Sequence, residues 1–258
     1  MSIEDIVSRA LEEDVGSGDI TTDLCVPADA RAVGRFIARE PIVVAGLEVL
    51  PLLFDHVEIE RGETIATVRG PARQLLTHER VALNFLQRMS GIATLTRNYV
   101  DAVAETKCRI LDTRKTTPGL RVLEKAAVKA GGATNHRMGL YDAVLIKNNH
   151  ITAAGGVTAA LGRVQNANVP VEIEVRTRAQ LDEALAAGAT HLLLDNLTPA
   201  DAREWIGHIN GRATVELSGG ITLENVRGYA EAGADYVSVG ALTHSARAVD
   251  INFRLQLE

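Results

Sequence analysis

The sequence is poor in cysteine, in aromatic residues and in positive charge. The two cysteines, Cys25 and Cys108, offer neither the spacing of a metal site nor a disulfide framework. Aromatic residues make up 3% of the chain, which argues against an aromatic binding surface. The formal net charge is -6, whereas a general nucleic-acid or anionic-membrane binder needs a basic face. These shortages argue against a cysteine metal site, an aromatic binding surface, and a general binder of nucleic acid or anionic membranes.

Long apolar runs are also lacking. No stretch approaches the length of a membrane-spanning segment. The first residues, "MSIEDIVSRALEEDVG", are acidic and amphipathic, and they lack the basic start and apolar centre of a signal peptide. Together with the unpaired cysteines, this predicts a soluble protein of the reducing cytoplasm.

Short apolar runs alternate with helical patterns from about residue 108 onward. Such runs, flanked by turn signals, are typical of buried parallel strands. Six of them in series favour an α/β fold of the TIM type, an (α/β) barrel that is complete or incomplete. A doubly wound open sheet is the alternative, weakened because no GxGxxG motif follows a first strand. The six predicted strands lie in residues 108–115, 143–150, 169–175, 191–196, 213–220 and 235–245.

The first hundred residues have a different pattern. Short strand-like segments separated by glycine and proline precede a long helical stretch, which predicts a smaller N-terminal α+β domain. We expect this domain to comprise residues 1–105 and the catalytic barrel residues 106–258, with the last residues able to pack back on the first domain. Thr177, Thr198 and Thr222 are each expected to cap the start of a helix.

Cations follow the first two predicted strands. Arg114 and Lys115 end the first, Lys147 ends the second, and the intervening loop carries His136 and Arg137. In a barrel the active site lies at the carboxyl ends of the strands, so these side chains can converge. Because arginine binds carboxylates and phosphates in a forked geometry, they indicate a polyanionic ligand, a dicarboxylate or a phosphate. Three further cations at helical spacing are expected to be solvated: Arg121, Lys125 and Lys129.

Acidic residues and glycine turns follow the later strands. Glu174 and Asp195 end the third and fourth, where they suit Mg²⁺ bridged to phosphates or, alternatively, structural pairing with the cations. Glu172 faces the same side of its strand as Glu174. Glycine-rich turns after the last two strands of such barrels commonly bind phosphate. The turns expected to do so are Ser218-Gly219-Gly220 and Gly240-Ala241-Leu242.

Long motifs throughout the chain resemble those of the quinolinate phosphoribosyltransferase family. They include "EDVGSGDITTDL" (13–24), "ERVALNFLQRMSGIATLT" (79–96), "DTRKTTPGLR" (112–121) and "GGATNHRMGLYDAVLIKNNH" (131–150). The shorter "VEIEV", "LLLDN", "ELSGGI" and "SVGALTHS" follow in the same order. The resemblance implies transfer of phosphoribosyl from 5-phosphoribosyl-1-pyrophosphate to quinolinate with loss of CO₂, giving nicotinate mononucleotide and pyrophosphate for NAD biosynthesis.

The resemblance also implies a role for each site residue. Arg80, Arg114, His136, Arg137 and Lys147 would line the quinolinate pocket, with Thr113 and Lys115 beside it. Arg80 would be donated across the interface of a homodimer or higher oligomer. Glu174 and Asp195 would hold the ribose hydroxyls and the Mg²⁺-pyrophosphate end, and the two glycine turns would bind the 5-phosphate. On this basis we expect Lys115, Lys147, Glu174 and Asp195 to be catalytic and Mg²⁺ to be the cofactor.

Two other functions fit the same architecture. One is a paralogous phosphoribosyltransferase-like protein of molybdenum transport operons, and the other is a non-catalytic barrel that binds a phosphorylated metabolite. The stretches "DVGSGDITT" and "DTRKTTPGLR" favour the quinolinate enzyme over the paralogue. A non-catalytic barrel predicts a missing acid or cation, and none is missing.

Overall fold

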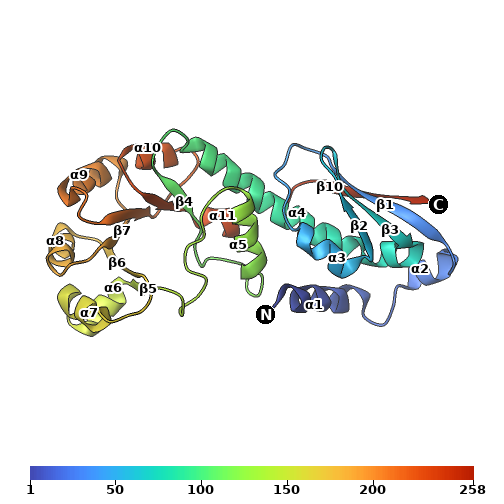
Figure 1. The fold of residues 1–258 in the computed structure, drawn as a ribbon, viewed down its shortest axis with the longest axis horizontal. Coiled ribbons are helices and arrows are strands. Elements are labelled where there is room, and N and C mark those ends of the chain that lie inside the picture. Colours follow the sequence, from blue (N-terminus) through green and yellow to red (C-terminus); the bar gives the residue numbers. More distant parts are fainter. The chain divides into compact units, whose positions relative to one another are not determined.

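The computed structural model describes residues 1–258, and the chain forms two compact units (Figure 1). The first comprises residues 1–97, 116–132 and 243–258, and the second comprises residues 98–115 and 133–242. Each unit therefore contains more than one stretch of sequence. The predicted division into domains 1–105 and 106–258 stays a prediction.

The first unit contains a four-stranded antiparallel sheet with the strand order β10-β1-β3-β2. The C-terminal strand β10 pairs with β1 from Ala32 opposite Leu257 to Ala38 opposite Ile251. Phe36 of β1 is fully buried, and its ring centroid lies 4.9 Å from that of Phe253. The strands are β1 (Arg31–Ala38), β2 (His56–Ile59), β3 (Thr64–Pro71) and β10 (Ile251–Leu257).

Among the helices of the first unit, α3 contacts strand β2, and α1 contacts both α3 and η1. The return segment, residues 243–250, crosses the long helix α4 at Gly91, where an added Cβ would lie 2.0 Å from the carbonyl oxygen of Arg247. Only glycine permits this close approach. The elements are α1 (Ile3–Val15), α2 (Ile20–Cys25), η1 (Leu47–Val49), α3 (Leu50–Leu53), α4 (Ala72–Ala102) and α5 (Arg121–Ala130); α4 continues into the second unit.

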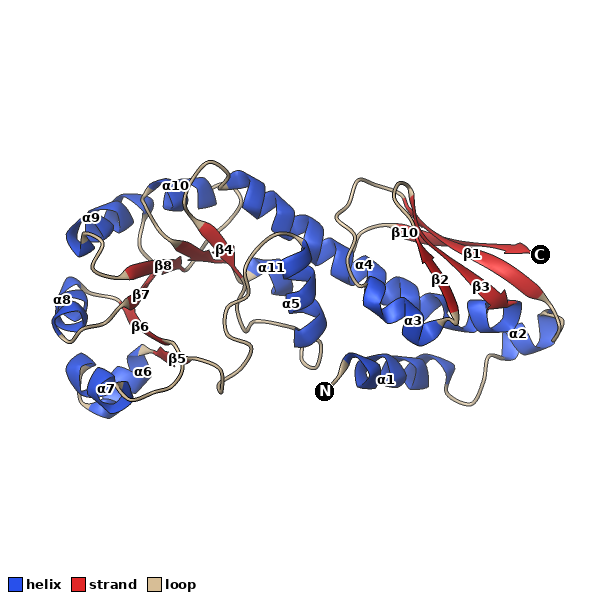
Figure 2. Ribbon diagram, viewed as in Figure 1, coloured by secondary structure: helices blue, strands red, loops and turns tan.

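The second unit contains a six-stranded parallel sheet with the order β4-β9-β8-β7-β6-β5. Helices α6 to α10 lie on the outer side of the curved sheet (Figure 2). β4 and β5 stand at its two edges, so the strands form an incomplete barrel and the predicted fold class is confirmed. The strands are β4 (Arg109–Leu111), β5 (Val144–Ile146), β6 (Val171–Val175), β7 (His191–Asp195), β8 (Thr214–Ser218) and β9 (Tyr236–Ser238).

Two of the three predicted helix caps are confirmed. Thr177 accepts the backbone N–H of Gln180 before α8, and Thr198 accepts that of Asp201 before α9. The Thr222 prediction is wrong, because α10 begins at Val226 and a turn separates it from β8. The helices are α6 (Asn148–Ala154), α7 (Val157–Val164), α8 (Arg178–Ala186), α9 (Pro199–Ile209), α10 (Val226–Glu231) and α11 (Ala241–His244).

The prediction for one of the helical cations is also wrong. Lys125 is 1% exposed instead of solvated, whereas Lys129 is exposed as expected. Arg121 donates from Nε to the Thr116 hydroxyl over 2.9 Å. Helical spacing alone did not distinguish the buried face of α5 from its exposed face. None of the helices combines the length and apolarity that would let it span a bilayer.

Candidate active site

A buried aspartate fixes the loop that carries His136 and Arg137. Asp112 directly follows β4 and is 0% exposed. Its Oδ2 accepts from the side chain of Asn135 over 2.7 Å, and its Oδ1 accepts the backbone N–H of His136 over 2.8 Å. The backbone of Thr134 bonds to Ile110 and Asp112 along the free edge of β4. The loop is therefore held by both backbone and side-chain bonds.

Arg137 lies beside a second arginine. Its Nη1 donates to the carbonyl oxygen of Ala143 over 3.0 Å. Burial lowers the pKa of Arg137, and the neighbouring charge of Arg114 lowers it further, while Asp142 and Glu172 act in the opposite direction. Two guanidinium groups that repel each other form a site in which an anion is favoured. The structure thus brings together these two predicted ligand cations.

His136 faces two carboxyl groups from different strands. Its Nε2 lies 3.2 Å from Oε2 of Glu172 and 3.6 Å from Oε2 of Glu216. Its Nδ1 accepts the backbone N–H of Arg137 over 2.6 Å, so a neutral ring carries its proton on Nε2, toward the carboxyl groups. Burial, and then the charge of Glu172, raise the pKa of Glu216 to about 8. The hydroxyl of Ser238 donates to Glu216.

These three side chains form an arrangement that also has the composition of a metal site. One ligand atom from each of His136, Glu172 and Glu216 lies within 4.8 Å of the others. The proton on the imidazole and the proton on the buried acid Glu216 already provide the hydrogen bonds that these three side chains need. We therefore interpret it as a hydrogen-bonded cluster that orients His136.

A second pair of acids lies at the carboxyl ends of β6 and β7. Arg176 joins them, with its Nη2 2.7 Å from Oε1 of Glu174 and 3.2 Å from Oδ2 of Asp195. Asp195 also accepts from the Ser218 hydroxyl over 2.8 Å and from the Asn196 amide over 2.7 Å. The Arg176 side chain is 51% exposed, so this pair lies near solvent.

The turn after β8 requires glycine at its second residue. Gly219 has φ +96°, and an added Cβ would lie 2.2 Å from Oδ1 of Asn196. Gly220, with φ +62°, has open space around it, and its carbonyl oxygen accepts from Asn225. The side chain and the backbone nitrogen of Asn196 therefore approach Gly219 closely at the carboxyl end of β8, next to Asp195. The other predicted turn, Gly240-Ala241-Leu242, leads from β9 into α11.

The remaining predicted residues of the second unit lie at the same strand ends. The Thr113 hydroxyl accepts the backbone N–H of Lys115 over 3.1 Å, in the loop after β4. Lys147 is exposed and directly precedes α6, where its backbone N–H donates to Nδ1 of His150. Lys115 is thus adjacent to Arg114 in the sequence after β4, and Lys147 directly follows β5.

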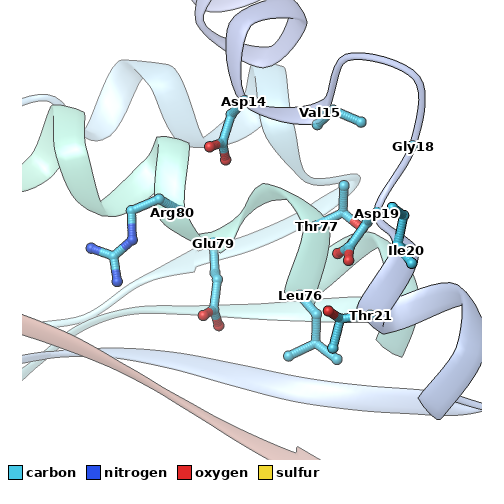
Figure 3. Close-up of a pocket in the computed structure, with 10 residues that line it drawn as sticks. All are labelled: Asp14, Val15, Gly18, Asp19, Ile20, Thr21, Leu76, Thr77, Glu79 and Arg80. Atoms are coloured by element: carbon cyan, nitrogen blue, oxygen red, sulfur yellow. The ribbon is translucent and has the colours of Figure 1, made fainter.

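Arg80 alone among the predicted site residues belongs to the first unit. It lines a pocket of about 330 Å³ formed by α1, the following turn, the start of α2 and α4. Figure 3 shows its guanidinium directed away from Asp19 and Thr77, on the opposite side of the pocket. Asp19 connects the turn after α1 to α4, because it accepts a hydrogen bond from the Thr77 hydroxyl over 3.1 Å.

Sequence reasoning missed Arg176 and Glu216. Arg176 follows the charged end of β6, and nothing in its position signals a bridge between two acids on different strands. Glu216 left a detectable signal, because it is a charged residue inside an apolar strand, two positions before Ser218 and hence on the same face. Asp112 appeared only as the first residue of the motif "DTRKTTPGLR", although it fixes the His136 loop.

Comparisons with known proteins cover nearly the whole chain. The sequence model of the quinolinate phosphoribosyl transferase N-terminal domain matches residues 19–90, and that of the C-terminal domain matches residues 92–254. The nicotinate-nucleotide pyrophosphorylase [carboxylating] of Mycobacterium leprae is 45% identical, over 97% of this chain and 96% of that protein. The probable nicotinate-nucleotide pyrophosphorylase [carboxylating] of Bacillus subtilis is 39% identical, over 100% of this chain and 94% of that protein.

Solved structures agree with the sequence comparisons. NadC from Streptococcus pyogenes matches with a TM-score of 0.93 at 39% identity, covering 99% of this chain and 97% of that chain. The nicotinate-nucleotide pyrophosphorylase of Ehrlichia chaffeensis matches with a TM-score of 0.93 at 37% identity, covering 99% of both chains. The chain therefore belongs to the quinolinate phosphoribosyl transferase family.

Proposed function

We propose that this protein transfers the phosphoribosyl group of 5-phosphoribosyl-1-pyrophosphate to quinolinate, with decarboxylation. The products are nicotinate mononucleotide, pyrophosphate and CO₂, in the biosynthesis of NAD. The observation that carries the proposal is the Arg137 guanidinium, which is held by the carbonyl oxygen of Ala143 and whose pKa is lowered by burial and then by repulsion from the charge of Arg114. Quinolinate bears two adjacent carboxylates, and a dianion of this kind relieves that repulsion. Family membership supports the same reaction.

The quinolinate pocket is assigned to the loop after β4, the loop between α5 and β5, and the end of β5. Arg114 and Arg137 bind the carboxylates, and Lys115 and Lys147 supply further positive charge. His136 contacts the substrate through a ring whose orientation the acids behind it fix. Thr113 lies beside the pocket and supports the Lys115 backbone. The substrate nitrogen is thereby presented to the ribose carbon in a fixed direction, which favours attack.

The ribosyl end is assigned to the acids at the ends of β6 and β7. The transferred ribose carbon gains positive charge as pyrophosphate leaves, and Glu174 and Asp195 stabilise that charge electrostatically. They also accept hydrogen bonds from the ribose hydroxyls. The 5-phosphate is assigned to Ser218-Gly219-Gly220 and Gly240-Ala241-Leu242, where small residues allow phosphate to approach backbone N–H groups.

The same acids fit Mg²⁺. Their donor set consists of carboxylate oxygens, which hard divalent cations prefer, and one guanidinium reaches both carboxylates from a single position. Glu174 and Asp195 would hold the ion directly, or through water or substrate. Bound Mg²⁺ would neutralise negative charge on the pyrophosphate leaving group.

Decarboxylation follows from the charge of the ribosylated ring. The bond between the ring carbon and the carboxylate beside the nitrogen breaks, and CO₂ leaves. The electron pair remains on the ring carbon, next to the positively charged nitrogen, and is then protonated. The cations of the pocket stabilise this electron-rich ring, and no covalent intermediate with the protein is required.

An assay with quinolinate, 5-phosphoribosyl-1-pyrophosphate and Mg²⁺ tests the proposal. We expect nicotinate mononucleotide from the wild type and loss of quinolinate use in Arg137→Ala, with little change in Tm because one of two opposed cations is removed. Arg203→Ala, an exposed arginine on α9, is the matched control and should retain activity. Folded wild type without product would refute the function, and an active Arg137→Ala would refute the cation assignment.

We further propose that the active form is a homodimer or higher oligomer in which Arg80 completes the partner's site. Arg80 lies in the first unit, apart in the chain from the other substrate residues, and is exposed. Mixing inactive Arg80→Ala and inactive Lys147→Ala subunits should restore part of the activity, because some mixed sites contain both residues. Mixed dimers that form and remain inactive would contradict the shared site.

A cytoplasmic location is also part of this proposal. Cys25 is exposed and Cys108 is buried, and both are free thiols, as expected in a reducing compartment. Relatives in plants are named chloroplastic or mitochondrial, so the location varies within the family. Fractionation of the source cells, followed by immunodetection of the protein, would decide the matter.

A further inference from the structure

A fully buried acid in the first unit holds the turn that follows the predicted quinolinate loop. The Glu124 side chain is 0% exposed. Its Oε1 accepts from the Thr117 hydroxyl over 2.8 Å, and its Oε2 accepts the Thr117 backbone N–H over 3.0 Å. Thr117 is thus fixed through both its side chain and its backbone. Lys115, a predicted substrate residue, lies only two residues earlier.

Arg88 connects this acid to a second stretch of backbone. Its Nη2 donates to Oε1 of Glu124 over 2.9 Å and also to the carbonyl oxygen of Thr243. Its Nη1 donates to the carbonyl oxygen of Ala246 over 2.7 Å. One planar guanidinium therefore bonds a buried carboxylate and two carbonyl groups at once. Thr243 directly follows the predicted phosphate turn, which ends at Leu242.

The bonds of the pair end at Thr117 and Thr243, close to the two points where the chain passes from the second unit to the first. Residues 98–115 belong to the second unit and residue 116 to the first, and the same change occurs between residues 242 and 243. The pair itself, Thr117 and Thr243 all lie in the first unit. Glu124 bonds to Thr117 and Arg88 bonds to Thr243, so a displacement of either loop displaces a group that this pair contacts.

Stability alone is a weak reason for this arrangement. Removing an ion pair from water is costly, and apolar residues of similar volume often stabilise a protein as well or better. A forked guanidinium with three acceptor contacts, in contrast, imposes a specific geometry on every group it bonds. Such a contact is suited to fixing two loops relative to the same point.

We propose that Arg88 and Glu124 are positioning residues that couple the binding of the dicarboxylate acceptor to the binding of the phosphoribosyl donor. The inference rests on the proposed function, since it takes the loops at 113–115 and 240–242 as the sites of the two substrates. When a ligand orders one loop, the shared guanidinium orders the start of the other. The second ligand then binds to a loop that is already placed.

Calorimetry with an unreactive acceptor tests the coupling. Phthalate carries two adjacent carboxylates but has no ring nitrogen, so it cannot accept the ribosyl group. Its Kd is measured with and without saturating 5-phosphoribosyl-1-pyrophosphate and Mg²⁺. In the wild type we expect the donor to tighten phthalate binding at least about five-fold, and phthalate to tighten donor binding by the same factor. In Arg88→Lys and Glu124→Gln this factor should fall to about one.

Two further variants separate positioning from folding. Arg247→Lys alters the Arg247–Glu40 contact, which holds the same return segment away from the phosphate turn, and should keep the wild-type coupling. Thr117→Val removes one hydroxyl while keeping a β-branched side chain, so it weakens the contact between Thr117 and Glu124. It therefore tests the inference even if Arg88→Lys and Glu124→Gln fail to fold. Its coupling factor should lie between those of the wild type and Glu124→Gln.

The outcomes distinguish this inference from the proposed function. Wild type that turns over but shows no coupling refutes the inference alone, as do variants that lose Tm yet keep the wild-type coupling. Wild type without turnover refutes the proposed function, whatever the calorimetry gives. Reduced coupling in Thr117→Val and loss of coupling in Glu124→Gln, with Arg247→Lys unchanged, support the inference.

Discussion

Two pairs of carboxyl groups project from strands of one sheet, yet their environments differ: the outer pair comes from the neighbouring strands β6 and β7, and the inner pair from β6 and β8, which β7 separates. The inner pair, Glu172 and Glu216, lies against His136 with no arginine between its members. The outer pair, Glu174 and Asp195, shares the half-exposed guanidinium of Arg176. Burial and the charge of Glu172 raise the pKa of Glu216 to about 8, so the inner pair retains a proton at neutral pH.

The difference shows that depth along a strand decides what an acid can do. Glu172 and Glu174 are two residues apart on β6 and face the same side, but only Glu174 reaches the strand end. The outer pair is suited to holding charge beside a cationic ribose centre. The inner pair is suited to holding a proton and fixing the imidazole. Three substitutions test this contrast.

The largest effect is expected when a charge is removed from the outer pair. Asp195→Asn keeps the shape of the side chain but loses the anion that stabilises the ribose centre, so kcat should fall about 100-fold or more. Steady-state kinetics at saturating substrates measure this change. Asp182→Asn, at the exposed Asp182–His208 contact, is the matched control and should keep the wild-type kcat. A wild-type kcat in Asp195→Asn would contradict the assigned role.

A smaller effect is expected from the proton on the inner pair. The folded-state pKa of Glu216 is raised, so its stabilising contribution is fully present below its ordinary pKa of 4.5 and is lost as the pH rises through about 8. Glu216→Gln keeps a hydrogen-bond donor without titrating. The free energy of unfolding of the wild type should therefore fall relative to that of Glu216→Gln between pH 5 and about pH 9.

Urea unfolding at several pH values within this range measures the difference. Glu231→Gln, in an exposed ion pair with Arg227, controls for removal of a surface charge. Its unfolding free energy should follow that of the wild type at every pH. If the Glu216→Gln curve also runs parallel to the wild-type curve, the buried acid is not the group that titrates.

The smallest effect is expected from Arg176→Gln. The arginine side chain is 51% exposed, so its ion pairs contribute less than about 1 kcal/mol to the free energy of unfolding. The outer carboxylates should then bind Mg²⁺ more tightly, because a competing cation is absent. Thermal unfolding and Mg²⁺ titration calorimetry measure the two effects. A large loss of stability, or weaker Mg²⁺ binding, would show that Arg176 organises the pair.

Local chemistry explains why much of the fold was predictable. Each of the six apolar runs contains one strand of the parallel sheet, because buried parallel strands need continuous apolar sequence. Thr198 followed by Pro199 marks a helix start through a side-chain bond and a fixed φ angle. The strand-end cations and acids could be grouped because strands of one parallel sheet end on the same side.

Long-range contacts explain what was not predictable. Lys125 has the spacing of a solvated helix residue, but neighbouring elements bury it. Thr222 has the chemistry of a cap, yet its backbone N–H bonds to Asn225 in a turn before the helix. The bridge made by Arg176 depends on two strands meeting at one height. These features arise from residues distant in sequence, which one sequence pattern does not report.

The free edge of β4 gives the His136 loop a second consequence. Thr134 bonds to β4 where another strand would pair, so the substrate loop also covers an open sheet edge. Unpaired edges invite pairing with other chains, and proteins usually protect them. Changes that release this loop should thus cause self-association as well as inactivity. Solubility, and not only catalysis, constrains the sequence that carries His136 and Arg137.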